Sequence, residues 1–151
     1  MKPKPTIGTE YYFWDGGKTS PSRLYKCKCE RIITPEETKN IKVKVPHWDF
    51  DCHCEYFEEE SLYEHWKAEV LNNDWLYSDD TDFFIECSCP KYDDNNLWFV
   101  RTKEGDWFSM NIQNSWQRGC LDIDGEKYKN VIEDYKNWAN TDDISIYENI
   151  T

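Results

Sequence analysis

The sequence predicts an α+β domain built on a curved antiparallel sheet or small β-barrel with two helices. Three observations support this fold class: short segments alternate apolar and polar residues, tight turns join them in place of βαβ connections, and two stretches have helical spacing. The predicted order is strands, helix, strands, helix. A length of 151 residues suits a single domain, 1–151, and the 8 Trp, 10 Tyr and 7 Phe argue against a disordered chain.

The first two strands are expected on either side of a glycine turn. Residues 10–14 form an aromatic segment that enters a turn at 15–18, where glycine supplies the positive φ that tight turns need. The return strand, 24–33, places Cys27 and Cys29 on one face, because side chains two residues apart in a strand point to the same side.

The next segment changes the parity of its apolar positions. They are odd in residues 41–45 but even between Phe50 and Tyr56, so we expect a bulge or corner at Pro46. The strand after this corner would carry acids about 6.6 Å apart on its outward side, a spacing similar to that of successive phosphates on one nucleic-acid strand. Its predicted outward residues are Asp49, Asp51, His53 and Glu55, and its predicted inward residues are Phe50, Cys52, Cys54 and Tyr56.

Two helices are expected. Ser61 and Glu64 form a capping box, which predicts a helix over 62–71 with an apolar stripe facing the core. Apolar residues with helical spacing predict a second helix over 128–139, with Asp124 available as its N-cap.

The remaining strands lie between these helices. Residues 83–89 alternate apolar and polar side chains and end at a proline. Residues 97–102 and 106–110 are joined by a short segment that contains glycine, and this pattern is the clearest hairpin signal in the chain.

Three Cys-x-Cys pairs fall in alternating segments. They are Cys27/Cys29, Cys52/Cys54 and Cys87/Cys89. Their thiols could converge on a Zn²⁺ ion, with His53 and Cys120 as further ligands. The pairs continue apolar faces, however, and free cysteine behaves as a small hydrophobe, so core packing is the favoured interpretation and no metal is predicted. Seven cysteines, an odd number, and no export signal favour reduced thiols.

Charge is segregated along the chain. The net charge of −12 divides into +5 for residues 1–46, −13 for 47–96 and −4 for 97–151. Such an acidic block repels nucleic acid and anionic membranes and attracts basic protein surfaces. Alternatively, its acids form exposed pairs with lysines across the sheet. The acids that we predict to contact a partner are Asp49, Asp51, Glu55, Glu58, Glu59, Glu60, Asp79, Asp80, Asp82, Asp93 and Asp94.

Two tryptophans and an arginine near the C-terminal end are further candidates for the partner surface. Trp107, Trp116 and Arg118 lie in a segment that also contains several amide side chains, and this combination is typical of interface anchors. Tryptophan in an alternating hairpin more often packs in the core, so both interpretations are carried forward.

The sequence contains no motif that supports an enzyme or a cofactor. Residues 17–19 resemble the end of a phosphate-binding loop, but Tyr12 occupies the first glycine position. Residues 122–125 resemble part of a calcium loop, but Cys120 and Val131 occupy ligand positions. We therefore predict a non-enzymatic protein without a cofactor. The absence of an export signal and of a long apolar segment predicts a cytoplasmic protein that does not bind membranes.

Three stretches carry a family resemblance. They read Gly-Thr-Glu-Tyr-Tyr-Phe-Trp-Asp-Gly-Gly-Lys at 8–18, Ser-Arg-Leu-Tyr-Lys at 22–26, and Pro-Lys-Tyr-Asp-Asp-Asn-Asn-Leu-Trp-Phe-Val-Arg-Thr-Lys-Glu-Gly-Asp-Trp-Phe-Ser at 90–109. The chain in this respect resembles small uncharacterised proteins encoded by phages and prophages of gut bacteria. The resemblance implies a genomic setting and no defined activity. Small acidic phage proteins include anti-CRISPR and anti-restriction proteins, some of which imitate nucleic acid.

Together these features predict a phage or prophage protein that binds and inhibits a host defence factor in the bacterial cytoplasm. Its acidic face would contact a basic surface on a nucleic-acid-binding effector and would not bind nucleic acid directly. One alternative is a protein that sequesters a small signalling nucleotide in a pocket lined by Trp and by Arg101 or Arg118. The other is a zinc-stabilised interaction module.

Overall fold

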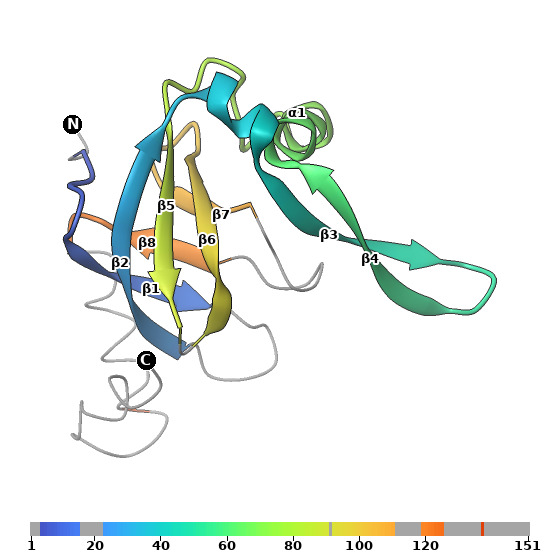
Figure 1. The fold of residues 1–151 in the computed structure, drawn as a ribbon, viewed down its shortest axis with the longest axis horizontal. Helices are drawn as coiled ribbons and strands as arrows, with labels where there is room; N and C mark the ends of the chain where they lie inside the picture. Colours follow the sequence, from blue (N-terminus) through green and yellow to red (C-terminus); the bar gives the residue numbers. More distant parts are fainter. Residues whose placement is uncertain (1–3, 16–22, 91, 111–118, 126–136, 138–151) are drawn as a thin grey trace.

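The computed structural model describes residues 4–15, 23–90, 92–110, 119–125 and 137 (Figure 1). The elements in chain order are β1 (Glu10–Asp15), β2 (Arg23–Ile33), the 3₁₀ helix η1 (Pro35–Asn40), β3 (Lys42–Asp49), β4 (Cys54–Ser61), α1 (Leu62–Asn72), β5 (Phe84–Cys89), β6 (Asp93–Arg101), β7 (Trp107–Ser109) and β8 (Gly119–Asp122). Figure 1 shows a barrel on one side and the β3–β4 hairpin projecting away from it.

Six strands form a closed antiparallel barrel in the order β1-β2-β5-β6-β7-β8. The barrel closes where β1 pairs with β8, with Phe13 opposite Leu121. β2 and β5 pair with each other in the barrel, and the elements η1, β3, β4 and α1 are inserted between them in the sequence. This architecture confirms the predicted α+β class with a small antiparallel barrel.

The barrel strands follow the predicted segments closely. β1, β2 and β5 cover the expected residues, and β6 pairs with β7 so that Arg101 faces Trp107. Thr102 N donates to Asp106 O at 2.7 Å and Gly105 has a φ of +89°, so the glycine turn of the second hairpin is also confirmed.

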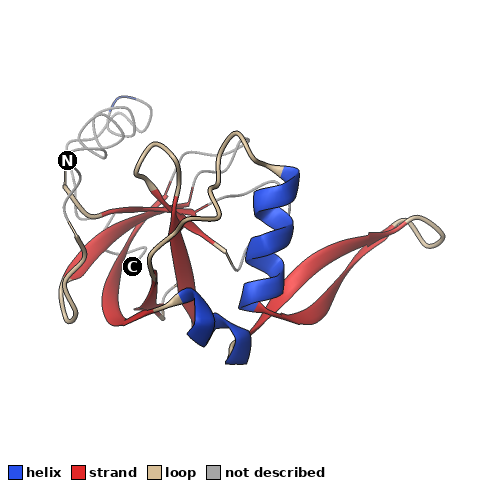
Figure 2. Ribbon diagram, turned by 90° about the horizontal axis from the view of Figure 1, so that it is seen from above, coloured by secondary structure: helices blue, strands red, loops and turns tan. Residues whose placement is uncertain are grey.

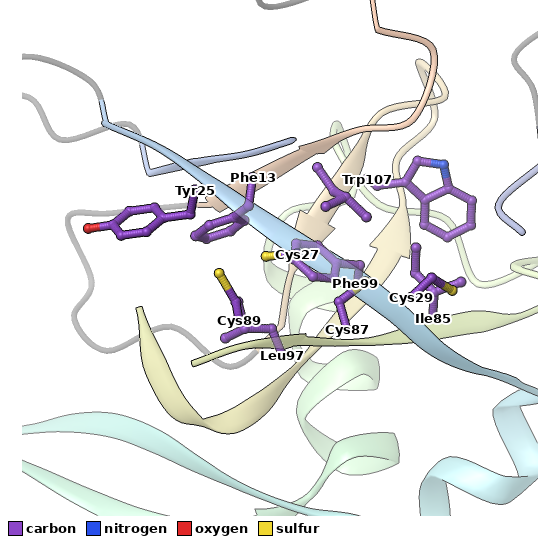
Figure 3. Close-up of a cluster of buried hydrophobic side chains, with 11 residues drawn as sticks. Phe13, Tyr25, Cys27, Cys29, Ile85, Cys87, Cys89, Leu97, Phe99 and Trp107 are labelled. Carbon is purple, nitrogen blue, oxygen red and sulfur yellow. The ribbon is translucent and has the colours of Figure 1, made fainter. Parts of the chain in front are cut away.

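Side chains from all around the barrel fill its interior (Figure 3). Alternation along each strand sends every second residue inward. The buried residues of this first core are Phe13, Tyr25, Cys27, Cys29, Ile85, Cys87, Cys89, Leu97, Phe99, Trp107 and Leu121. The inward positions of β2 and β5 are those that the sequence pattern predicts.

A second core lies on the outer side of β5 and β6. Phe84 and Val100 alternate with the inward residues of their strands, so these two strands are buried on both faces. The helix α1 packs here through Leu62 and Trp66, and the ring of Trp66 meets that of Phe84 edge-on at 5.3 Å between centroids. The members of this second core are Ile33, Val43, Val45, Leu62, Trp66, Tyr77, Phe84, Trp98, Val100 and Met110.

The helix α1 begins and ends where the sequence predicts. Ser61 Oγ accepts a hydrogen bond from Glu64 N at 3.1 Å and so caps the first turn. Asn73 follows the last turn and its N–H donates to Glu69 O. The predicted second helix over 128–139 lies outside the described residues except for residue 137. No helix among the described residues has the length and apolar character needed to cross a membrane.

One predicted strand is wrong. Residues 50–53 form the turn between β3 and β4, so the chain reverses where the sequence pattern suggested a continuous strand over 49–55. The parity change of the apolar residues arises from this reversal and not from a corner at Pro46, which lies within β3 opposite Phe57. As a result Phe50 and Tyr56 are exposed instead of pointing into a core.

Candidate functional site: an acidic, aromatic arm

The hairpin of β3 and β4, residues 42–61, is referred to here as the arm. Its two strands form a separate two-stranded sheet that extends away from the barrel in both views (Figures 1 and 2). The arm is anchored at its base, where Val43 and Val45 are buried in the second core beside α1. Residues 46–60 carry six acids and neither lysine nor arginine. The arm therefore concentrates negative charge on a projecting element.

The register of the arm sorts its side chains onto two faces, because directly opposite residues of an antiparallel pair point to the same side. One face, called the aromatic face, consists of the pairs Lys44–Glu59, Pro46–Phe57 and Trp48–Glu55. The other, called the histidine face, consists of Val43–Glu60, Val45–Glu58, His47–Tyr56 and Asp49–Cys54. Both faces thus combine carboxylates with rings.

Several rings on the arm are exposed to solvent. Among the described residues, four of the eight large apolar side chains that are exposed belong to the arm. They are Trp48 at 50%, Phe50 at 78%, Tyr56 at 40% and Phe57 at 48%. Trp48 and Phe50 meet edge-on, with 6.5 Å between ring centroids. Exposed rings gathered on one element and flanked by charges are typical of a binding surface.

The turn at the end of the arm is held by its own side chains. Asp49 Oδ1 accepts hydrogen bonds from Asp51 N at 2.8 Å and from Cys52 N at 3.4 Å. His53 has a φ of +54°, in the left-handed region where tight turns commonly use glycine. Cys52 and Cys54 form a disulfide, with 5.4 Å between their Cα atoms. The prediction of reduced thiols is therefore wrong for this pair, because the turn brings the two side chains together.

The predicted partner-binding acids divide between three places. Six of them, Asp49, Asp51, Glu55, Glu58, Glu59 and Glu60, lie on the arm. Asp79, Asp80 and Asp82 are exposed in the connection between α1 and β5, outside the arm. Asp93 and Asp94 belong to the first residues of β6, and their side chains lie outside the described part of the structure.

One of the predicted anchors, Trp107, lies in the barrel core and not on the arm. Trp107 is buried in the barrel core with 3% of its surface exposed and packs against Phe83 at 5.3 Å between ring centroids. Core packing is therefore the correct interpretation for Trp107, which is not available to a partner. Trp116 and Arg118 lie outside the described residues.

Sequence reasoning missed the exposed rings of the arm. The pattern indicated that Phe50 and Tyr56 share a face with cysteines, and it assigned that face to a core. A usable signal was Asp49, since aspartate often accepts hydrogen bonds from the backbone two and three residues later and so begins a turn. Trp48 and Phe57 gave no such signal.

Two of the three cysteine pairs meet in the barrel. Cys29 lies directly opposite Cys87, and the same register brings Cys27 opposite Cys89 (Figure 3). All four thiols are buried, as the core-packing interpretation predicts. Burial and a hydrogen bond with Cys89 raise the pKa of Cys27. The hydrogen bond with Cys29, together with burial, raises the pKa of Cys87, and this bond lowers the pKa of Cys29.

Comparison with protein-family models, with curated proteins and with solved structures finds no match for this chain. The resemblance to phage and prophage proteins therefore stays a prediction. The arm is the candidate site that the structure adds.

Proposed function

We propose that this is a non-enzymatic phage or prophage protein that binds a basic protein surface through its arm. The proposed partner is a nucleic-acid-binding effector of host defence, whose groove the arm would occupy in place of nucleic acid. The observation that carries the proposal is the pairing of exposed rings with carboxylates on one projecting hairpin.

Proteins that bind single-stranded nucleic acid combine a positively charged groove with aromatic side chains on which bases stack. The aromatic face of the arm offers the complementary chemistry. Glu55 and Glu59 lie on the same side of β4 as Phe57, one two residues before it and the other two residues after it. Successive side chains on this face are therefore about 6.6 Å apart. Carboxylates would then take the place of phosphates, and the rings of Phe57 and Trp48 would take the place of bases.

The shape of the arm supports the same partner class. Two strands side by side are only about 4.8 Å apart, so the arm is a thin ribbon with both broad faces accessible along its outer half. A ribbon of this kind fits a narrow groove better than a flat surface. Carboxylates on both faces would meet basic side chains on both walls of such a groove.

Lys44 lies opposite Glu59 and reduces the field at the base of the aromatic face. An exposed ion pair between two such residues would contribute at most about 1 kcal/mol, so Lys44 would not prevent Glu59 from binding an arginine of a groove. Residues 46–60 contain neither lysine nor arginine, so no base of this segment offsets its six acids.

The test is quantitative affinity capture from a bacterial host lysate with three forms of the protein. The first is the native protein, the second is the arm variant Asp51→Asn/Glu55→Gln/Glu59→Gln, and the third is the control Asp79→Asn/Asp80→Asn/Asp82→Asn. Both variants remove three exposed acids, but only the first removes them from the arm. We expect the arm variant to lose capture of a nucleic-acid-binding protein by about tenfold or more, and the control to retain it.

Capture alone does not support the proposal. The captured protein must also be released by added single-stranded oligonucleotide and by raised salt, because the proposed contact is electrostatic and shares the nucleic-acid groove. Equal capture by the arm variant and the native protein, or a partner that holds nucleic acid and this protein at the same time, would show that the arm does not imitate nucleic acid.

A further inference from the structure

We propose that His47, Glu58 and Glu60 form a binding site for a divalent transition-metal ion of the Zn²⁺ type on the histidine face of the arm. This site does not rest on the proposed partner, because it depends only on side chains within the arm. Among the described residues, these three present an imidazole nitrogen and two carboxylate oxygens that all lie within 4.8 Å of one another.

The distances between the ligand atoms suit a single ion. His47 Nε2 lies 3.2 Å from Glu60 Oε1 and 3.7 Å from Glu58 Oε2. Around a tetrahedral Zn²⁺ with bonds of about 2.0–2.2 Å, neighbouring ligand atoms are about 3.3–3.6 Å apart. Both distances from the imidazole nitrogen lie within a few tenths of an ångström of this range. The oxygens of Glu58 and Glu60 lie within 4.8 Å of one another, and rotation of either exposed carboxylate would bring them into the same coordination sphere.

The fold of the arm places these three side chains together. His47 pairs with Tyr56, and Glu58 and Glu60 occupy the next two positions along β4 on the same face. The imidazole stacks on the ring of Tyr56, with 5.6 Å between centroids and 25° between planes, and this contact holds its orientation. Glu58 and Glu60 pair with Val45 and Val43, which are buried in the second core, so the ligands lie on the anchored half of the arm.

The chemistry of the ligand set selects the class of ion. Imidazole and carboxylate together suit Zn²⁺ and neighbouring first-row divalent ions, whereas Ca²⁺ and Mg²⁺ prefer oxygen ligands alone. Two carboxylates balance the charge of the ion and lose their mutual repulsion when it binds. Three protein ligands leave a fourth position for water or for a side chain of a partner, as in zinc sites that are not purely structural.

The test is calorimetric titration of the disulfide-intact protein with Zn²⁺, in parallel with Co²⁺ titration followed by absorption. The ligand variants are His47→Gln and Glu60→Gln. The matched control is Glu59→Gln, which removes the same charge from the same strand but on the aromatic face. We expect one Zn²⁺ per chain, an affinity at least about tenfold lower in each ligand variant, and an unchanged affinity in the control.

Two further measurements separate this site from other binding. Co²⁺ at the site is expected to show no sulfur-to-metal charge transfer, because its ligands are nitrogen and oxygen. Hydrogen exchange of the β3 and β4 amides is expected to slow when Zn²⁺ is added to the native protein and to Glu59→Gln, but not to His47→Gln. The proposal is overturned if Zn²⁺ fails to bind, if Glu59→Gln weakens binding as much as Glu60→Gln, if His47→Gln binds normally, or if Co²⁺ is held by thiolates.

Discussion

Cys52 and Cys54 are joined by a disulfide that closes around His53 alone, at the end of the arm farthest from the barrel. Their Cα atoms are 5.4 Å apart, within the usual range for a disulfide. The other five cysteines are buried free thiols. The two chemical states of cysteine in this chain thus coincide with two environments, an exposed turn and a packed core.

Replacing the disulfide by serines is expected to leave the barrel stable. Closing a loop this short removes little entropy from the unfolded chain, so Cys52→Ser/Cys54→Ser should lower the free energy of unfolding by no more than about 2 kcal/mol. Urea unfolding followed by tryptophan fluorescence measures this change. A much larger loss would mean that the end of the arm supports the barrel, contrary to its projecting position.

The barrel strands could be predicted from the sequence because their inward faces are continuous. Cys27, Cys29, Ile85 and Cys87 alternate with polar residues and all enter the same core. The pattern identifies which residues share a face, and in the barrel that face meets other apolar side chains from neighbouring strands. The cap of α1 at Ser61 was predictable for a local reason, since a capping box needs no tertiary contact.

The arm could not be predicted in the same way. Phe50 and Tyr56 have the spacing of a buried face, but the chain reverses between them and both are exposed. The spacing of apolar residues shows which side chains share a face, but it does not show whether other parts of the protein pack against that face. The acids of the candidate site could be predicted because the charge of a segment is read directly from its sequence. The contact of His47 with Glu58 and Glu60 could not, because it depends on which residues of β3 and β4 lie opposite one another, and the position of the turn decides this.

Two phenylalanines provide a direct test of the division between core and arm. Phe99 is fully buried and meets Phe13 edge-on at 5.6 Å between centroids, whereas Phe57 is 48% exposed on the aromatic face. We expect Phe99→Ala to lower the free energy of unfolding by about 3–5 kcal/mol and Phe57→Ala to lower it by less than about 1 kcal/mol. Chemical denaturation of both variants measures the difference. A similar cost for both would place Phe57 in a core.

The buried thiols are expected to resist modification. Burial raises the pKa of Cys27, and the hydrogen bond with Cys29 together with burial raises that of Cys87, so neither forms the reactive thiolate easily. Iodoacetamide should label neither Cys27 nor Cys87 in the native protein within the time needed to label both in denaturant. Mass spectrometry of the labelled peptides gives the readout, and rapid native labelling of Cys27 or Cys87 would contradict the closed core.

The same thiols predict how stability depends on alkaline pH. In the unfolded chain they lose their protons near pH 9.0, whereas in the folded protein the raised pKa values keep Cys27 and Cys87 protonated. The unfolded state then binds fewer protons, so stability is complete below about pH 9 and falls above it by about 1.4 kcal/mol per pH unit for each such thiol. Urea unfolding of the native protein and of Cys27→Ala/Cys87→Ala at increasing pH measures the slopes. Equal slopes would remove the thiols as the cause.

Adding one methyl group to β8 is expected to disturb the closure of the barrel. A Cβ atom on Gly119 would lie 2.0 Å from Phe13 Cε2 and 2.1 Å from Phe13 Cζ, and Phe13 is fully buried where β1 and β8 join. Glycine to alanine at an unstrained position ordinarily stabilises a protein by about 0.4–1 kcal/mol, because the unfolded chain loses freedom. At Gly119 overpacking reverses the sign, and we expect Gly119→Ala to lower the free energy of unfolding by about 1–3 kcal/mol.

A double-mutant cycle with Phe13→Leu shows whether this clash is the cause of the loss. Leucine lacks the ring atoms that a Cβ on Gly119 would meet, so Phe13→Leu should cost less stability in the Gly119→Ala background than in the native protein. We expect a coupling free energy of at least about 0.5 kcal/mol between the two positions, measured by urea unfolding of the four proteins. If the two changes in unfolding free energy simply add, Gly119→Ala acts through the backbone of β8 and not through Phe13. The barrel would then accommodate the added methyl group by a larger separation between β1 and β8.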